Sequence, residues 1–307
     1  MTRPPIISVV IVMTIAVSCA GGSGDHVPEA APVVEIQSGF AQVHGGRLYY
    51  ELTGSGDAIV LVHGNAGDRR HWDAQFSALA VDYQTIRYDV RGFGKSSLPV
   101  EGRSYSDHED LATLLDHLGV KAAHVVGFSM GSGIAVDFSL AYPNRTRSLI
   151  SVGPWVFGYS SPAAQDFFAD VAQVRAAIAN GGAEAGVDAW MGAPFLTATI
   201  TDPAAGERLR QIVSDHSFWD FSHRSPQRVL EPSAAGRTRE IQAPTLILAG
   251  EHDIPACLEV ADLLDESVPG SRKIIMEQTG HLLLIEKPEE FNQHLIDFID
   301  TVSRGGV

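Results

Sequence analysis

Six short segments rich in apolar residues recur along the chain, each with the length of a β-strand. They cover residues 58–62, 83–88, 122–128, 148–152, 245–249 and 273–276. The first, AIVLV, is apolar throughout, as expected for a strand buried on both faces of a sheet. Before them, two short strands are predicted within residues 40–52, joined as a hairpin around His44-Gly45-Gly46.

Helical patterns separate most of these segments. After Ser106, which forms a capping-box sequence with Glu109, leucines recur at helical spacing at positions 111, 114, 115 and 118. Further helices are predicted over 130–141 and from Pro288 onward. Alternating strands and helices predict an α/β fold with a doubly wound, mostly parallel sheet, to which the hairpin adds an antiparallel edge.

The alternation stops between residues 155 and 242, where helices are predicted over 163–180, 184–191 and 204–217. We interpret this stretch as a helical cap inserted into a core formed by 35–154 and 243–303. Its large apolar side chains are candidate pocket residues, although most are expected only to pack the cap helices together. They are Trp155, Phe157, Phe167, Phe168, Trp190, Met191, Phe195, Phe218 and Trp219.

The N-terminus has the pattern of an export signal. Arg3 precedes an apolar run at 6–17, which is shorter than the roughly 20 apolar residues that span a bilayer. Small residues then lead to Cys19, as in bacterial lipoproteins. We expect a signal peptide over 1–19, lipid attachment at Cys19 and a flexible tether over 20–34. The protein would be exported, either lipid-anchored at the cell membrane or periplasmic or extracellular; plain secretion after cleavage nearby is the alternative.

The composition is that of a globular protein, with 307 residues, 45% of them hydrophobic and 19% charged. A disordered or collagen-like chain is therefore excluded. With 22 Lys and Arg against 37 Asp and Glu, the formal net charge is −15, so a nucleic-acid partner is not expected. Two cysteines cannot form a disulfide framework, and we expect Cys257 to be a packing residue.

The sequence GFSMG at 127–131 joins a predicted strand to the predicted helix that follows it. A serine between two glycines in this context is typical of a nucleophile elbow, a sharp turn that holds the hydroxyl above the sheet. The helix N-terminus adds free N–H groups and partial positive charge. Ser129 is therefore the candidate nucleophile.

Four further motifs follow the order found in the α/β-hydrolase family, which the chain resembles over roughly residues 35–300. They are HGNAG at 63–67, YDVRGFGKS at 88–96, GEHD at 250–253 and GH at 280–281. The resemblance implies an α/β-hydrolase fold in which the nucleophile is followed along the chain by an acid and then by a histidine.

Asp253 and His281 fit the acid and the histidine. Each follows a predicted strand, so both are expected at the carboxyl edge of the sheet with Ser129. Glu251, closer to the strand end, is the alternative acid. In such a set the histidine takes the serine proton and the carboxylate stabilises the imidazolium.

Acyl transfer also needs N–H donors for the oxyanion. The backbone N–H of Met130 directly follows the nucleophile and is one candidate, and the resemblance implies that of Asn65 as the second. In relatives, the histidine equivalent to His63 braces the loop. Asp89 and Arg91 are expected to anchor the turn after strand 83–88.

These residues predict an exported serine hydrolase that cleaves a small carboxylic ester or lactone through an acyl-enzyme. A prolyl-type aminopeptidase or a C–C bond hydrolase on the same scaffold is an alternative, and so is an inactive binding module with this fold. Serine rather than aspartate at the elbow disfavours epoxide opening and halide displacement. We expect no metal and no cofactor, because neither a ligand set nor a phosphate-binding loop stands out.

Overall fold

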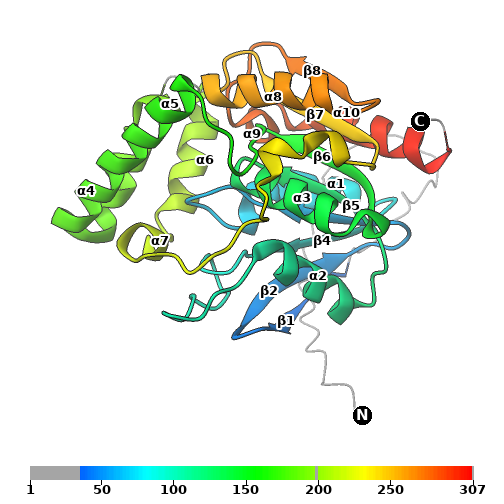
Figure 1. Ribbon diagram of the computed structural model, residues 1–307, viewed down its shortest axis with the longest axis horizontal. Helices are drawn as coiled ribbons and strands as arrows, with labels where there is room; N and C mark the ends of the chain where they lie inside the picture. Colours follow the sequence, from blue (N-terminus) through cyan, green and yellow to red (C-terminus); the bar gives the residue numbers. More distant parts are fainter. Residues whose placement is uncertain (1–34, 198–199, 306–307) are drawn as a thin grey trace, which may run out of the picture.

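The computed structural model describes residues 35–197 and 200–305, and an eight-stranded sheet forms their centre (Figure 1). The strand order is β1-β2-β4-β3-β5-β6-β7-β8. The strands are β1 (Gln37–Val43), β2 (Gly46–Thr53), β3 (Ala58–Val62), β4 (Gln84–Tyr88), β5 (Ala123–Phe128), β6 (Thr146–Val152), β7 (Thr245–Gly250) and β8 (Arg272–Met276). β2 pairs antiparallel with β1 and β4, and all other pairs are parallel. The predicted α/β fold with an antiparallel edge is confirmed.

Helices cover both faces of the sheet because successive side chains of a buried strand point to opposite sides. In β3, Ile59 and Leu61 share one core with α1 and α10, whereas Val60 and Val62 share the other with α2, α3 and α8. The helices of the core are α1 (Asp73–Leu79), α2 (Asp107–Leu118), α3 (Met130–Ala141), α8 (Pro255–Ser267), α9 (Leu283–Glu286) and α10 (Pro288–Ser303), with short 3-10 turns η1 (Arg69–Trp72) and η2 (Pro143–Arg145).

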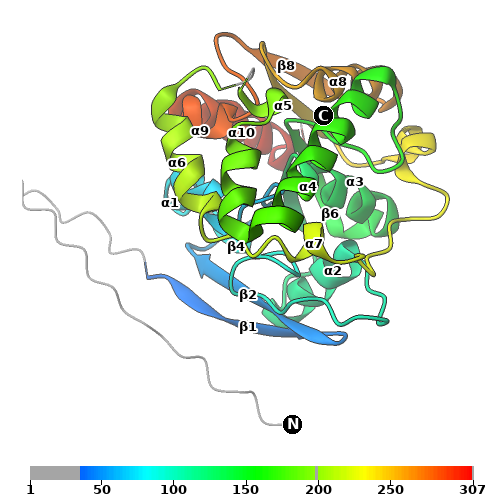
Figure 2. The same cartoon turned by 90° about the vertical axis from the view of Figure 1, so that its left-hand side faces the viewer.

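Between β6 and β7 the chain forms a helical insertion that lies together beside the sheet in Figure 1 and in front of it in Figure 2. Its elements are α4 (Pro162–Met191), α5 (Pro194–Thr197), α6 (Pro203–Val213) and α7 (Trp219–Ser222), followed by η3 (Ala234–Gly236) and η4 (Thr238–Glu240). α4 is broken at Gly182, which adopts φ 72°. The sequence predicts this break, because two adjacent glycines weaken a helix there.

Two local predictions are wrong. α6 ends at Val213 rather than at residue 217, because the His216 ring accepts the N–H of Phe218 and turns the chain toward α7. Ser106 precedes α2 but its side chain makes no capping hydrogen bond. Instead, Glu109 and Asp110 place acidic side chains in the first turn of α2, at the positive end of the helix dipole.

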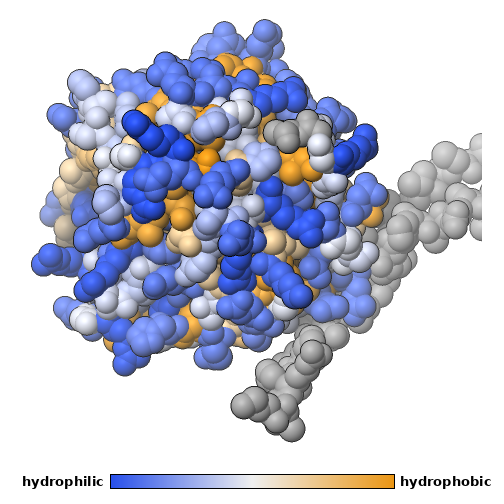
Figure 3. Space-filling model, turned by 45° about the vertical axis from the view of Figure 1, so that its right-hand side comes forward, coloured by the Kyte–Doolittle hydropathy of each residue, from blue (hydrophilic) through white to orange (hydrophobic). Residues whose placement is uncertain are grey.

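Polar and charged side chains cover most of the face shown in Figure 3, and the apolar ones are scattered over it. Within the described residues, no helix combines the length and the apolar character needed to cross a membrane. The predicted signal peptide, Cys19 and the tether lie outside the described part of the chain.

Candidate active site

Ser129 occupies a strained turn between β5 and α3. Its backbone adopts φ 54° and ψ −117°, and α3 begins at the next residue. A Cβ on Gly127 would lie 2.1 Å from the carbonyl oxygen of Gly131, and one on Gly131 would lie 2.3 Å from that of Val62. Because both obstacles are backbone atoms, only glycine fits at these two positions. The glycines of the pentapeptide therefore allow the turn that projects the serine hydroxyl from the sheet edge.

Three side chains from separate loops form one hydrogen-bonded chain. The Nε2 atom of His281 lies 3.0 Å from Ser129 Oγ, and its Nδ1 atom lies 2.6 Å from Asp253 Oδ1. An Nδ1–H donated to the carboxylate leaves Nε2 unprotonated, so that it can accept the serine proton. Asp253 also accepts the N–H of Ile254 at 2.7 Å, which fixes the carboxylate. The arrangement suits general-base activation of an alcohol.

The alternative acid lies outside this chain of hydrogen bonds. Glu251 is exposed, and its Oε2 atom accepts the N–H of Gln278 at 2.9 Å. The structure thus brings Ser129, Asp253 and His281 together and leaves Glu251 apart.

The two predicted oxyanion donors border the serine. Met130 is the first residue of α3, so its N–H has no acceptor within the helix. Asn65 follows β3, in a loop held by the buried His63 ring. His63 Nδ1 donates to the Gly64 carbonyl at 2.8 Å, and Nε2 accepts the N–H of Val90 at 2.9 Å. Burial lowers the pKa of His63, which keeps the ring neutral and able to make both bonds.

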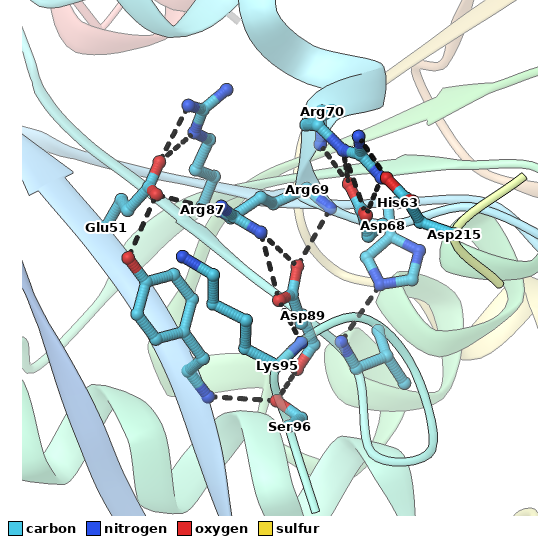
Figure 4. A network of polar contacts seen from close by, with 12 residues as sticks. Glu51, His63, Asp68, Arg69, Arg70, Arg87, Asp89, Lys95, Ser96 and Asp215 are labelled. Carbon is cyan, nitrogen blue, oxygen red and sulfur yellow. Dashed lines mark hydrogen bonds and ion pairs between the residues drawn. The ribbon is translucent and has the colours of Figure 1, made fainter. Parts of the chain in front are cut away.

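A network of ion pairs and hydrogen bonds links the residues after this loop to β2 and to the turn after β4 (Figure 4). The buried Asp89 carboxylate accepts the backbone N–H of Arg69 at 3.0 Å and that of Lys95 at 2.8 Å, and it pairs with the Arg69 guanidinium. Arg69 and Arg87 both reach Glu51 on β2. Burial alone would raise the pKa of Glu51, but the charges of Arg87 and Arg69 outweigh it and lower that pKa. Arg91 pairs with Asp110 on α2, so these motif residues hold turns, as predicted.

Two cavities meet at Ser129. The larger has a volume of about 300 Å³ and the smaller about 40 Å³, and Asn65, Phe167 and Ile254 line both together with the serine. The large cavity is also lined by Met130, Trp155, Phe157, Phe168, Arg175, Trp219 and a polar group formed by Tyr105, Asp107, Ser225 and Gln227. The small cavity is also lined by His71, Phe128, Trp190, Phe195, Leu196, Leu209, His281 and Leu282.

Most of the large apolar candidates from the sequence line one cavity or the other, but two do not. Phe218 is buried against the rings of His216 and Phe221, and Met191 packs at the edge of the core. Neither borders the two cavities at Ser129. Helical spacing could not separate these two from their neighbours, because it places residues on a face without showing what covers that face.

A family model described as the alpha/beta hydrolase fold matches residues 57–288. The chain belongs to the α/β-hydrolase family. It is 31% identical over 267 residues to a putative carbamate hydrolase RutD of Azorhizobium caulinodans, covering 85% of this chain and 98% of the relative. It is 30% identical over 283 residues to a 2-hydroxy-6-oxononadienedioate/2-hydroxy-6-oxononatrienedioate hydrolase 2 of Pseudomonas putida (85% and 96%). It is 26% identical over 281 residues to the carboxylesterase YbfK of Bacillus subtilis (87% and 88%). These three relatives of this α/β-hydrolase are named as hydrolases or an esterase.

Two further residues of this α/β-hydrolase border the site without any sequence motif that marks them. His71 lines the small cavity, and its Nδ1 atom accepts the N–H of Gly64 at 3.3 Å. Burial lowers the pKa of His71 to about 3, so the ring is neutral. Cys257 is buried as predicted, but it also lines the large cavity.

Cys257 also belongs to a possible metal-ligand set. Its thiol and side-chain atoms of Asp253 and His281 lie within 4.8 Å of one another, the one such group of three among the described residues. Asp253 and His281 already bind each other, and burial raises the pKa of the Cys257 thiol well above its usual value. A metal ion there would have to displace the histidine from its carboxylate, so this group does not fit a resident metal.

Proposed function

We propose that this protein is a serine hydrolase that cleaves a small carboxylic ester or lactone through an acyl-enzyme. The observation that carries the proposal is the hydrogen-bonded chain from Ser129 through His281 to Asp253, with distances of 3.0 and 2.6 Å. It opens onto a cavity of about 300 Å³, within the usual range for small-molecule sites.

The geometry supports a two-step mechanism. Ser129 Oγ attacks the substrate carbonyl while His281 Nε2 takes its proton, and the N–H groups of Met130 and Asn65 stabilise the oxyanion. The imidazolium, stabilised by Asp253, protonates the leaving alcohol as the C–O bond breaks. A water molecule then gives a proton to His281 and attacks the acyl-enzyme carbonyl. The bond between the acyl carbon and Ser129 Oγ breaks, His281 returns the proton to Oγ, and the acid is released.

The relatives support hydrolysis but differ in the bond that their names imply. The carboxylesterase of Bacillus subtilis favours the ester proposal, whereas the Pseudomonas putida hydrolase keeps a C–C bond hydrolase as the second candidate. A prolyl-type aminopeptidase and an inactive binding module are the other outcomes that the experiments below distinguish.

The first experiment labels the folded protein with a fluorophosphonate, which reacts with activated serines. We expect stoichiometric labelling of Ser129 and none in Ser129→Ala. A folded wild-type protein that stays unlabelled would contradict the enzyme proposal. Turnover is then compared among carboxylic esters, a lactone, a vinylogous 1,5-diketone and a prolyl amide. Faster cleavage of the diketone or the amide would overturn the ester proposal in favour of the corresponding alternative.

We further propose that the protein is exported and carries a lipid on Cys19. The support is the sequence alone, a short apolar run followed by small residues and a cysteine. Mass spectrometry of the mature N-terminus from bacterial membranes tests this proposal. A diacylglycerol on Cys19 that is lost in Cys19→Ser supports it, whereas an unmodified N-terminus beyond residue 20 contradicts the lipid.

A further inference from the structure

The two cavities at Ser129 differ about sevenfold in volume, and each borders a different part of the catalytic machinery. Met130, whose N–H is an oxyanion donor, lines the large cavity and not the small one. His281 lines the small cavity and not the large one. A substrate carbonyl bonded to Ser129 therefore lies where the two cavities meet.

The proton transfers decide which part of an ester enters which cavity. In the proposed mechanism the leaving oxygen must come within hydrogen-bond distance of His281 Nε2, since that atom protonates it. The alcohol portion then extends into the cavity that His281 lines, which is the small one. The acyl chain extends away from His281, past Met130, into the large one.

The small cavity cannot easily enlarge, because its walls are tightly packed. The ring of Phe195 packs edge-to-face on Phe167 at 4.9 Å and on Trp190 at 5.2 Å between centroids. Leu209 and Leu282 also line it and are buried. Its volume of about 40 Å³ is far below the about 300 Å³ of the large cavity. It therefore takes the smaller side of the ester, a short alcohol, and well-packed walls resist a larger one.

The large cavity is built for a bulkier group. Trp155, Phe167 and Phe168 form an aromatic wall with ring centroids 5.4 to 5.7 Å apart. Ser132 fixes Trp155, since its Oγ lies 3.2 Å from the Trp155 N–H and 3.1 Å from its carbonyl oxygen. Phe168 is 53% exposed, so this wall reaches the surface and leaves room for substituents.

We propose that this protein prefers esters in which a bulky, aryl-bearing acyl group is joined to a methyl or ethyl alcohol. The inference rests on the proposed function, because it assigns acyl and alcohol sides to the same serine. It names a substrate class that the hydrogen-bonded chain of Ser129, His281 and Asp253 does not specify by itself.

A pair of isomeric esters tests the assignment without any substitution. Methyl phenylpropanoate and phenylethyl acetate are isomers that differ only in the direction of the ester bond. Each has a simple alkyl alcohol as its leaving group. We expect kcat/KM to be at least about tenfold higher for the methyl ester, the scale of discrimination that a tight pocket achieves. Equal or reversed values would overturn the assignment, and so would turnover of neither ester by protein that a fluorophosphonate labels at Ser129. Absence of labelling would instead contradict the proposed function itself.

Substitutions in the walls of the two cavities test the acyl and alcohol assignments separately. Leu209→Ala should raise the butyl-to-methyl ratio of kcat/KM for phenylpropanoate esters by about tenfold, because it removes a wall of the small cavity. The milder Leu209→Val should move the ratio in the same direction and serves if the alanine variant does not fold. Phe168→Ala is the matched control on the large cavity. It should leave this ratio unchanged while raising KM for methyl phenylpropanoate relative to methyl acetate. The assignment would be reversed if Phe168→Ala changed the butyl-to-methyl ratio of kcat/KM while a folded Leu209 variant left that ratio unchanged.

Discussion

At the scale of single residues, the tautomer of His281 decides whether the serine can be activated. The Nδ1–H is held by one carboxylate oxygen at 2.6 Å, so the basic nitrogen faces Ser129 Oγ. An amide in place of that carboxylate presents an N–H donor as readily as an acceptor and loses the charge that stabilises the imidazolium. A substitution of Asp253 by asparagine can therefore keep the shape of the site while it removes the charge that activation of the serine needs.

We expect Asp253→Asn to lower kcat by about 10⁴-fold while the protein stays folded, since the side chains have the same shape. The matched control is Glu251→Gln, two residues away and outside the hydrogen-bonded chain. It should retain kcat within about twofold of the wild type. Steady-state kinetics on one ester measures both variants, and a larger loss in Glu251→Gln than in Asp253→Asn would contradict the assignment of the acid.

At the scale of elements, the crossing of β5, α3 and β3 depends on very close backbone contacts. A Cβ on Gly131 would meet the carbonyl oxygens of Val62 and His63 at 2.3 and 2.6 Å. Neither atom can rotate away, because both belong to the end of β3 and the loop that carries Asn65. The same glycine therefore serves the packing of α3 and the placement of Asn65, the proposed oxyanion donor.

Gly131→Ala should lower the free energy of unfolding by about 2 kcal/mol or more, the cost of overpacking a tight core. Gly236→Ala is the control, because a Cβ there has no heavy atom within 4 Å and the glycine is not in the left-handed region. Its effect should stay within about 0.5 kcal/mol. Urea unfolding followed by circular dichroism gives both values, and equal effects would show that the close contact is not what excludes alanine.

Periodicity and motif order predicted the strands, the major core helices and the residues that meet at Ser129, because short stretches of sequence carry the signals for these features. Phe167 and Phe218 are both aromatic residues of the predicted cap, yet one borders both cavities and the other packs on His216. The difference depends on how α4 and α7 pack, which is set by tertiary contacts. For the same reason the sequence did not reveal that Leu209 on α6 would limit a cavity beside His281.

At the scale of the whole molecule, ion pairs and hydrogen bonds tie the helical insertion to the sheet domain, and two of these contacts differ in burial. On one side, Arg70 of η1 bridges Asp68 and Asp215, the latter just after α6. On the other, Gln227 of the segment after α7 donates a hydrogen bond to Asp107 at the start of α2. The first contact is partly exposed and therefore weak. The second involves the buried carboxyl of Asp107, so its energy depends on the protonation of that group.

The stability of the protein should depend on pH through Asp107. Burial, with the nearby charge of Asp110, raises the pKa of Asp107 to about 8, while Arg91 and Gln227 only partly oppose this. Unfolded aspartate titrates near about 4, so between about pH 4 and 8 the folded state holds a proton that the unfolded chain has released. Stability from this group is then complete below about pH 4 and is lost as the pH rises toward 8.

Asp107→Asn removes that proton uptake while keeping the size of the side chain and an acceptor for Gln227. We expect the melting temperature of the variant, relative to the wild type, to be at least about 3 °C higher at pH 8 than at pH 5. Glu109→Gln is the control, since Glu109 lies in the same turn but is exposed, and it should shift the melting temperature equally at both pH values. Thermal unfolding monitored by circular dichroism measures the two differences. A variant of Asp107 whose relative stability does not change with pH would show that the carboxyl is ionised in the folded protein, where the nearby charge of Arg91 favours the ionised form.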